Sequence, residues 1–428
     1  MLTELLARPQ AAAAANSARV EAVVARCGVR AYLLREPTVP FLSLTLHIAG
    51  GAAADPPDHL GLAYLAAGLL DEGAGPYDSQ AFRGELEDHA IRLQFEADRD
   101  GISGELRTLT AARDHAFALL RLALTEPRFD AEPVERVRGQ ILADLRRREA
   151  DPDYLASRAW FGAAFPDHPY GRPTRGGAAS IAAIGTADCH GFATRRLARD
   201  RLVVGVAGDI TAEELVPLLD ATFGDLPVGE PLPPLPAVAP RVGAVEVLRL
   251  DIPQSVVVFG HGGLERHDPD YYAGYVANYI LGGGGFSSRL LEEVREKRGL
   301  AYSAYSYLHE LEKAPLWLGG VATNNQQVAQ SLAIVRGELA RMARGELDDT
   351  DLANARTYLT GSFPLRLTSN DQVAKMLVGM LVHDLGRDFL DRRNALIEAV
   401  TLEDLRRASA RLFSGELLVS VVGDPAGL

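Results

Sequence analysis

The strongest constraint on the fold of this 428-residue chain is that its pattern occurs twice, at an offset of about 212 residues. The apolar segments LTLHIAGG at 44–51 and VVVFGHGG at 256–263 each precede a proline-containing turn, a helical pattern and a glycine-rich run. The segments VVGVAGD and LVSVVGD close the two halves, and their aspartates, Asp209 and Asp424, are 215 residues apart. A similar offset at both ends favours an internal duplication over chance similarity between apolar strands.

A proline-rich window, PVGEPLPPLPAVAPRVG at 227–243, separates the two halves. Prolines at this density disfavour a helix or a central strand and favour an extended spacer. We therefore predict an N-terminal domain of 1–228, a linker of 229–243 and a C-terminal domain of 244–428. Each half shows a strand, a helix, further strands, long helices and a closing strand, which predicts an α+β fold of two homologous layered domains. Each domain is expected to be a mainly antiparallel sheet with helices packed on it.

Hydrophobic periodicity predicts most of the elements. Helices are expected at 61–75, 78–92, 108–126, 131–150, 153–163, 326–345, 349–360 and 370–385, and strands at 93–106 and 301–308.

Composition and charge exclude several classes of function. The net charge is -13, and no cluster of Lys and Arg lacks interleaved acids, so we expect no nucleic-acid binding. No apolar run approaches the ~18–20 residues of a membrane span, and residues 1–18 lack the pattern of a signal peptide. Arg supplies nearly all of the basic residues, which is typical of GC-rich bacterial genomes. We expect a soluble bacterial protein, in the cytoplasm or periplasm, that makes no membrane contact.

The most informative segment is GGGGFSSRLLEEVREKRGLAY, residues 282–302. It predicts a helix capped by Ser287 or Ser288, with Leu290, Leu291 and Val294 buried and Gly299 in the left-handed conformation at its end. Arg295 then lies in the last turn and Tyr302 on the next strand. A guanidinium offers forked donors to carbonyl groups, and a phenol can donate to a developing oxyanion. The alternative is that Arg295 pairs with an acid such as Glu292 and that Tyr302 is a core residue.

The glycine run itself lacks the spacing of a nucleotide-binding loop. Two interpretations of it stay open. It is either a flexible loop beside a peptide channel or a tight strand–helix junction. No two of the ten histidines lie four residues apart, so we predict no metal site in this chain.

Two segments resemble the pitrilysin/insulinase superfamily of zinc peptidases, in its processing-peptidase branch. FSSRL at 286–290 and VREKRGLAY at 294–302 are similar to the signature of its C-terminal domain, and GLAYLAAGLLDEGAG at 61–75 is similar in position to its zinc-binding helix. Active members carry His-x-x-Glu-His there. The resemblance places Tyr64, Ala67 and Gly68 at those three positions and Asp144 at the third ligand.

These residues are poorly suited to zinc. Ala67 and Gly68 have no ligand atom, and the phenol of Tyr64 has an ordinary pKa near ~10. Gly68 inside a helix would cost roughly 1 kcal/mol relative to Ala, and close packing against another element would explain it.

The resemblance spans about residues 17–424 and implies a clam-shell assembly of two peptidase-like domains. In that family the Arg holds a peptide carbonyl and the Tyr hydroxyl points at the scissile carbonyl, which assigns those roles to Arg295 and Tyr302. Gly283, Gly284 and Phe286 match the glycine-rich substrate loop.

The resemblance therefore implies the non-catalytic subunit of a heterodimeric zinc metallopeptidase. A homologous partner would supply the zinc, and the substrate would be a peptide or an unfolded polypeptide. We expect no stoichiometric zinc in this chain and no cleavage by it alone. The alternatives are a scaffold or assembly protein, as in the core subunits of respiratory bc-type complexes, and a self-sufficient hydrolase with an unrecognised site.

Overall fold

A computed structural model of the chain describes residues 20–428, which form two compact units. The first unit comprises the described part of Met1–Leu142 together with Thr174–Pro233 and Ser362–Arg393. The second unit comprises Ala143–Pro173, Pro234–Gly361 and Asn394–Leu428. Each unit is thus assembled from three separate segments of the chain. Residues 1–18, for which we predicted no signal peptide, lie outside the described part.

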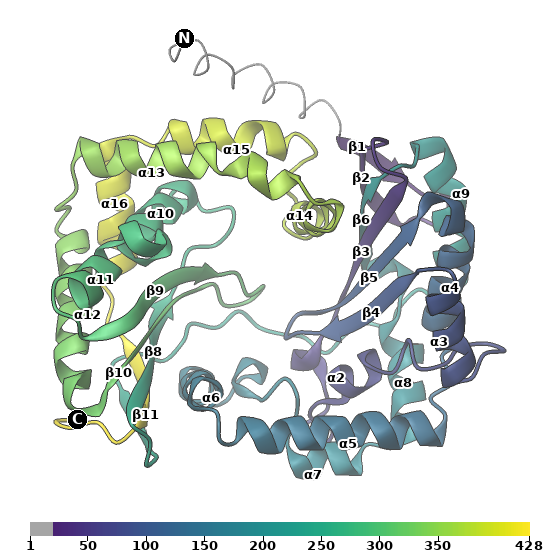
Figure 1. Cartoon of the computed structure of the whole chain (residues 1–428), viewed down its shortest axis with the longest axis horizontal. Helices are drawn as coiled ribbons and strands as arrows, with labels where there is room; N and C mark the ends of the chain where they lie inside the picture. The colour runs from purple at the N-terminus through teal and green to yellow at the C-terminus, as the bar shows by residue number, and fades with distance from the viewer. Residues whose placement is uncertain (1–19) are drawn as a thin grey trace. The chain divides into compact units, whose positions relative to one another are not determined.

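The first unit is built on a six-stranded sheet with the strand order β1-β2-β6-β3-β5-β4 (Figure 1). β6 runs parallel to β2, and the other neighbouring strands are antiparallel. Every residue of β6 is buried, so this strand is covered on both faces. The strands are β1 Val20–Val24, β2 Arg30–Arg35, β3 Phe41–Ala49, β4 Arg92–Ala97, β5 Gly101–Leu109 and β6 Leu202–Gly208.

The second unit repeats this topology, without a counterpart of β1, in a five-stranded sheet with the strand order β7-β11-β8-β10-β9. β11 runs parallel to β7 and antiparallel to β8, as β6 does to β2 and β3. The match in order and direction agrees with the predicted duplication and confirms the α+β fold of two homologous layers. The strands are β7 Val245–Arg249, β8 Gln254–Gly262, β9 Ala301–His309, β10 Leu316–Asn324 and β11 Leu418–Gly423.

Helices cover both sheets. Those of the first unit are α2 Leu62–Ala67, α3 Ser79–Asp88, α4 Arg113–Thr125, α7 Ala178–Ala183, α8 Thr186–Arg196, α9 Ala212–Phe223 and α14 Asn370–Val382. Those of the second unit are α6 Pro152–Ala164, α10 Tyr271–Asn278, α11 Arg289–Leu291, α12 Val328–Ala343, α13 Asp349–Gly361 and α16 Leu402–Phe413. α5 Ala131–Arg148 and α15 Phe389–Glu398 each cross a boundary between the units.

Each sheet takes one covering helix from the other half of the sequence. α14 packs on β6 and β3 of the first sheet, and α6 packs on β11 and β8 of the second (Figure 1). A Cβ atom on Gly205 would lie 2.2 Å from the carbonyl oxygen of Ala374, so the backbones of β6 and α14 are in direct contact. The indole Nε1 of Trp160 on α6 donates to the carbonyl of Leu418 on β11 at 3.0 Å.

This exchange differs from the expectation that each half keeps its own helices. An apolar helix face must be buried, but its pattern does not specify the sheet that buries it. The window 227–243 contains neither helix nor strand, as its prolines predict. The domain bounds of 1–228, 229–243 and 244–428 stay a prediction from the sequence.

One predicted helix is much shorter than expected, because α2 ends at Ala67 and the chain continues in turns rather than reaching residue 75. Among the described residues, no helix combines the length and the apolar character needed to cross a lipid bilayer.

Candidate functional site

The loop that leads into α2 is held by a buried carboxylate. Asp55 is 3% exposed, and its oxygens accept the backbone N–H groups of Gly61 at 3.1 Å and Ala63 at 3.2 Å. Burial raises the pKa of the Asp55 carboxyl to about 6, although these hydrogen bonds and the Arg196 guanidinium act in the opposite direction. The sequence pattern had not indicated this residue, because a single Asp in a loop carries no spacing signal.

Tyr64, at the first predicted ligand position, is bound within the first unit. Its hydroxyl accepts a hydrogen bond from Nη1 of Arg175 at 2.6 Å. The Arg175 guanidinium carbon also lies 4.5 Å from the centroid of the Tyr64 ring. The phenol oxygen therefore already faces a cation, which opposes the approach of a metal ion.

Gly68, at the second ligand position, is the C-cap residue of α2. A Cβ atom there would lie 3.5 Å from its nearest neighbour, a backbone oxygen of the same helical turn. The predicted close packing of Gly68 against another element is therefore wrong. The reason is that the helix ends at Ala67, so that Gly68 is at its end and not in its interior.

Asp144, at the third ligand position, lies on α5 in the second unit. Its carboxylate pairs with Nε of Arg148 at 2.6 Å and also with Arg147. Two guanidinium groups already bind this acid, so a metal ion would have to compete with both. The residues at the four motif positions therefore do not fit a catalytic zinc ion.

The corresponding segment of the second unit has an irregular backbone. α10 continues into a π-helical turn, Tyr279–Gly283, and α11 continues into a second one, Glu292–Glu296. π-helical turns are rare and are frequently found at functional sites. The segment ends at Gly299, whose φ of +59° is the predicted left-handed conformation.

The glycine run between these turns has two different parts. A Cβ atom on Gly282 would lie 2.4 Å from Oγ and 2.6 Å from the backbone nitrogen of Ser306, so Gly282 permits close contact with β9. Gly285 has a φ of +58°, which favours glycine. Gly283 is exposed and Gly284 is half-buried. A Cβ atom on Gly283 or Gly284 would lie 2.9 Å from an atom of Asn278 or Tyr279, whereas Gly285 has no neighbour within 4 Å. The run is therefore a tight junction that opens only at Gly285.

Arg295, Tyr302 and Phe286 lie together at the surface. The guanidinium carbon of Arg295 lies 4.9 Å from the ring centroid of Phe286 and 4.8 Å from that of Tyr302. Phe286 is 73% exposed and Tyr302 is 80% exposed. Tyr302 therefore lies outside the core, and the acid beside Arg295 is Glu296, at 3.4 Å, rather than Glu292. We call these three residues the Arg295 cluster.

The chemistry of the Arg295 cluster suits a peptide backbone. A guanidinium that contacts ring faces keeps its in-plane N–H groups for hydrogen bonds to carbonyl oxygens. The exposed phenol of Tyr302 offers one further donor, and the exposed ring of Phe286 offers an apolar contact.

A buried polar network holds the strand that carries Tyr302. Oδ1 of Asn278 accepts from Oγ of Ser306 at 2.8 Å and from Nε1 of Trp317 at 2.9 Å, which connects α10 to β9 and β10. All three residues are buried. Such satisfied networks fix the relative positions of the elements that they join.

The cap of α11 differs from the prediction. Ser288 is the N-cap residue, but its hydroxyl donates to the carbonyl of Gly285 at 2.7 Å instead of accepting a helix N–H. Ser287 likewise donates to Gly284 at 2.9 Å. Both hydroxyls stabilise the turn before the helix. The predicted buried stripe of Leu290, Leu291 and Val294 is confirmed.

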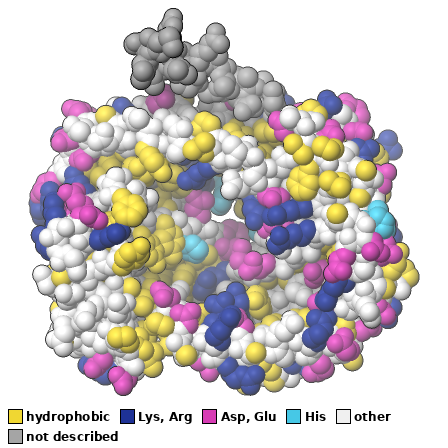
Figure 2. All heavy atoms as spheres, viewed as in Figure 1, with side chains coloured by type: hydrophobic (Ala, Val, Ile, Leu, Met, Phe, Trp, Pro, Cys, Tyr) yellow, Lys and Arg dark blue, Asp and Glu magenta, His cyan; other side chains and the backbone are white. Residues whose placement is uncertain are grey.

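The face of the molecule in Figure 2 shows acidic and basic side chains intermixed, with hydrophobic side chains between them. No continuous basic surface is visible in this view.

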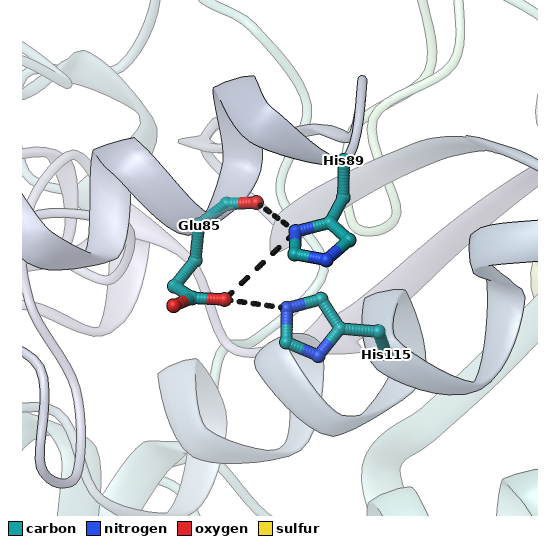
Figure 3. Close-up of side chains that lie close together, drawn as sticks. All are labelled: Glu85, His89 and His115. Atoms are coloured by element: carbon teal, nitrogen blue, oxygen red, sulfur yellow. Dashed lines mark hydrogen bonds and ion pairs between the residues drawn. The ribbon is translucent and has the colours of Figure 1, made fainter.

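A group of metal-ligand type lies elsewhere in the first unit (Figure 3). Glu85 and His89 are four residues apart at the end of α3, and His115 lies in the first turn of α4. Within the described residues, this is the one group of three such side chains whose ligand atoms converge. The i, i+4 spacing of Glu85 and His89 is visible in the sequence, but a comparison of histidines with one another misses it.

Two family models match this chain, one after the other. Residues 30–177 match the model for insulinase (peptidase family M16), and residues 184–359 match the model for the peptidase M16 inactive domain. The chain belongs to the insulinase family, peptidase family M16.

Relatives within this family carry two kinds of name. "Non-peptidase homolog YmxG" of Helicobacter pylori is 29% identical over 324 residues, which are 75% of each chain. An "uncharacterized zinc protease" of Streptomyces coelicolor is 31% identical over 315 residues, covering 70% of this chain and 67% of the relative.

A solved structure, a peptidase M16 inactive domain from Pseudomonas fluorescens, has a TM-score of 0.89 and 25% identity. The similarity covers 95% of this chain and 98% of that one. The inactive-domain model, the Helicobacter relative and the Pseudomonas structure support a non-catalytic member of the family.

Proposed function

We propose that this chain is the non-catalytic subunit of a heterodimeric zinc peptidase, and that Arg295 and Tyr302 bind its peptide substrate. The observation that carries the proposal is the exposed Arg295 cluster in the second unit, together with motif positions in α2 that do not fit zinc. A homologous partner supplies the zinc-binding His-x-x-Glu-His helix.

In this arrangement the guanidinium of Arg295 donates to a main-chain carbonyl of the substrate. The hydroxyl of Tyr302 donates to the scissile carbonyl, whose oxygen gains negative charge during the attack of water. The exposed Gly283, the half-buried Gly284 and the ring of Phe286 contact neighbouring substrate residues. The relatives named as a non-peptidase homologue and as an inactive domain support this division of labour.

The test is to co-express the chain with a homologue of similar length that carries His-x-x-Glu-His, preferably the product of a neighbouring gene, and to assay cleavage of unstructured peptides. We expect the pair to cleave and neither chain to do so alone. Tyr302→Phe should lower kcat about a hundred-fold while the heterodimer still forms, because one donor to the oxyanion is lost. Tyr307→Phe is the matched control, since Tyr307 is a second exposed tyrosine of β9 outside the cluster.

Unchanged turnover in the Tyr302→Phe complex would reject the role of this residue. Cleavage by the purified single chain would instead favour the self-sufficient hydrolase. A chain that neither joins such a homologue nor supports cleavage would favour the scaffold protein.

A further inference from the structure

The side chains of Glu85, His89 and His115 converge at one end of α3. His89 is the C-cap residue of α3, and His115 approaches from the adjoining helix α4. Oε2 of Glu85 lies 2.9 Å from Nε2 of His115 and 3.8 Å from Nδ1 of His89. One nitrogen of each ring is directed towards the same carboxylate oxygen (Figure 3).

These separations are close to those of a tetrahedral metal site. Zinc binds imidazole nitrogen and carboxylate oxygen at about 2.0–2.2 Å, which places neighbouring ligand atoms of a tetrahedron about 3.3 Å apart. The two measured separations, 2.9 and 3.8 Å, lie on either side of that value. All three ligand atoms lie within 4.8 Å of one another.

The exposure of the cluster suits a site with an open position. The side chains of Glu85, His89 and His115 are 30%, 44% and 33% exposed. Solvent therefore reaches the cluster, and water can complete the coordination of an ion held by three protein ligands.

Two existing hydrogen bonds would change on binding. The one between Oε2 of Glu85 and Nε2 of His115, at 2.9 Å, is lost because the ion takes the place of the shared proton. Nδ1 of His89 lies 3.0 Å from the backbone carbonyl of Glu85. An ion bound at this nitrogen replaces that hydrogen bond, and the carbonyl, at the exposed end of a helix, can turn to water instead.

His59 shows that a histidine beside two acids is not enough for a site. Its Nδ1 lies 3.2 Å from Asp58, and its Nε2 lies 3.7 Å from Asp188. The two carboxylates face opposite nitrogens of the ring, so they cannot share one ion with it. In the cluster on α3 and α4, by contrast, the carboxylate and both rings face a common point.

We propose that Glu85, His89 and His115 bind a divalent transition-metal ion, with Zn²⁺ as the favoured ion, at a site separate from the family's zinc helix. Two imidazoles and one carboxylate are a ligand set that zinc accepts readily. The ion connects the end of α3 to the start of α4. This site departs from the expectation that the chain binds no stoichiometric zinc, and it does not depend on the proposed function.

The test uses the full chain, stripped of metal and titrated with Zn²⁺ by calorimetry, and with Co²⁺ by visible absorption. We expect one ion per chain and a Co²⁺ spectrum that reports nitrogen ligands. His115→Asn and Glu85→Gln should each weaken Zn²⁺ binding at least ten-fold. These side chains are partly exposed, so the variants should fold, and circular dichroism checks that they do.

His59→Asn and Tyr64→Phe are the controls, and both should bind Zn²⁺ within two-fold of the parent chain. No binding of Zn²⁺ by the folded parent chain would overturn the proposal. Unchanged binding in His115→Asn, or loss of binding in Tyr64→Phe, would overturn it as well.

Discussion

The segments that follow β3 and β8 have the same place in two sheets of the same topology, yet they present their side chains in opposite ways. After β3, the hydroxyl of Tyr64 accepts a hydrogen bond from Arg175, and α2 ends at its C-cap residue, Gly68. After β8, Arg295 lies between two exposed aromatic rings at the surface. The same arrangement of strands therefore supports a segment whose polar side chains are paired internally in one unit and a segment with exposed side chains in the other. We call them the closed segment and the open segment.

The largest effect should come from glycines in these two segments. Gly282→Ala should lower the free energy of unfolding by about 2–3 kcal/mol, because the new methyl group would overlap with Ser306 on β9. Gly68→Ala is the matched control in the first unit, and it should change stability by about 0.5 kcal/mol or less, since the new methyl group would make only ordinary van der Waals contacts. Urea denaturation followed by circular dichroism measures both, and equal losses would contradict the comparison.

The second effect concerns Asp55 and Asp268, the acids that precede α2 and α10 in the segments after β3 and β8. Burial raises the pKa of Asp55 to about 6. The folded state therefore binds the proton more tightly than the unfolded state does. This contribution to stability is complete below about pH 4 and falls by about 2–3 kcal/mol as the pH rises through 6.

The pKa of Asp268, which precedes α10, is shifted in the opposite direction. Burial acts to raise its pKa, but the hydrogen bonds from Arg411 and from the backbone N–H of Asp270, together with the charge of Arg411, outweigh burial and lower it. Its contribution is present at neutral pH and is lost as the pH falls through the acid range.

Melting temperatures measured from pH 3.5 to 7.5 test both acids. In Asp55→Asn, the melting temperature should fall less between pH 4 and 7 than in the parent chain. A smaller fall should remain because burial also raises the pKa of Asp71 to about 6. Asp268→Asn should change the profile at the acid end only. If the melting temperature of Asp55→Asn falls as steeply as that of the parent chain, the Asp55 carboxyl of the parent is already ionised in the folded state over this pH range.

A smaller effect should follow from removing one hydroxyl in the closed segment. Tyr64→Phe keeps the ring contact with Arg175 but loses the hydrogen bond at 2.6 Å. We expect a loss of about 1 kcal/mol in the free energy of unfolding. No measurable loss would indicate that water replaces the phenol without cost.

The smallest effect on stability is expected in the open segment. Tyr302→Phe and Phe286→Ala should each change the free energy of unfolding by about 0.5 kcal/mol or less, because both side chains are largely exposed. A larger loss would assign the Arg295 cluster a structural role. Denaturation curves of these variants also show whether any loss of activity in the complex arises at the site itself.

The sequence predicted the features that depend on local spacing. The repeated strand segments gave the two related sheets, and the apolar stripe with Gly299 correctly predicted a helix end that brings Arg295 near Tyr302. The predicted length of α2 was wrong. The leucines after Ala67 continue the apolar pattern of the helix, but the chain there forms turns.

Features that depend on tertiary packing were not predictable in this way. The exchange of α6 and α14 between sheets depends on which apolar surfaces meet, and periodicity does not encode this. The convergence of His115 on Glu85 and His89 likewise requires α4 to lie beside α3, and no local spacing reports it.

The exchange of α14 has a consequence for synthesis on the ribosome. The first sheet is complete once β6 emerges, yet the helix that covers one of its faces begins at residue 370. At about 5–20 residues per second, the intervening chain takes roughly ten to thirty seconds to appear. During that interval an apolar sheet face is open to water, so a nascent chain stalled before residue 370 should recruit chaperones that bind exposed apolar surface.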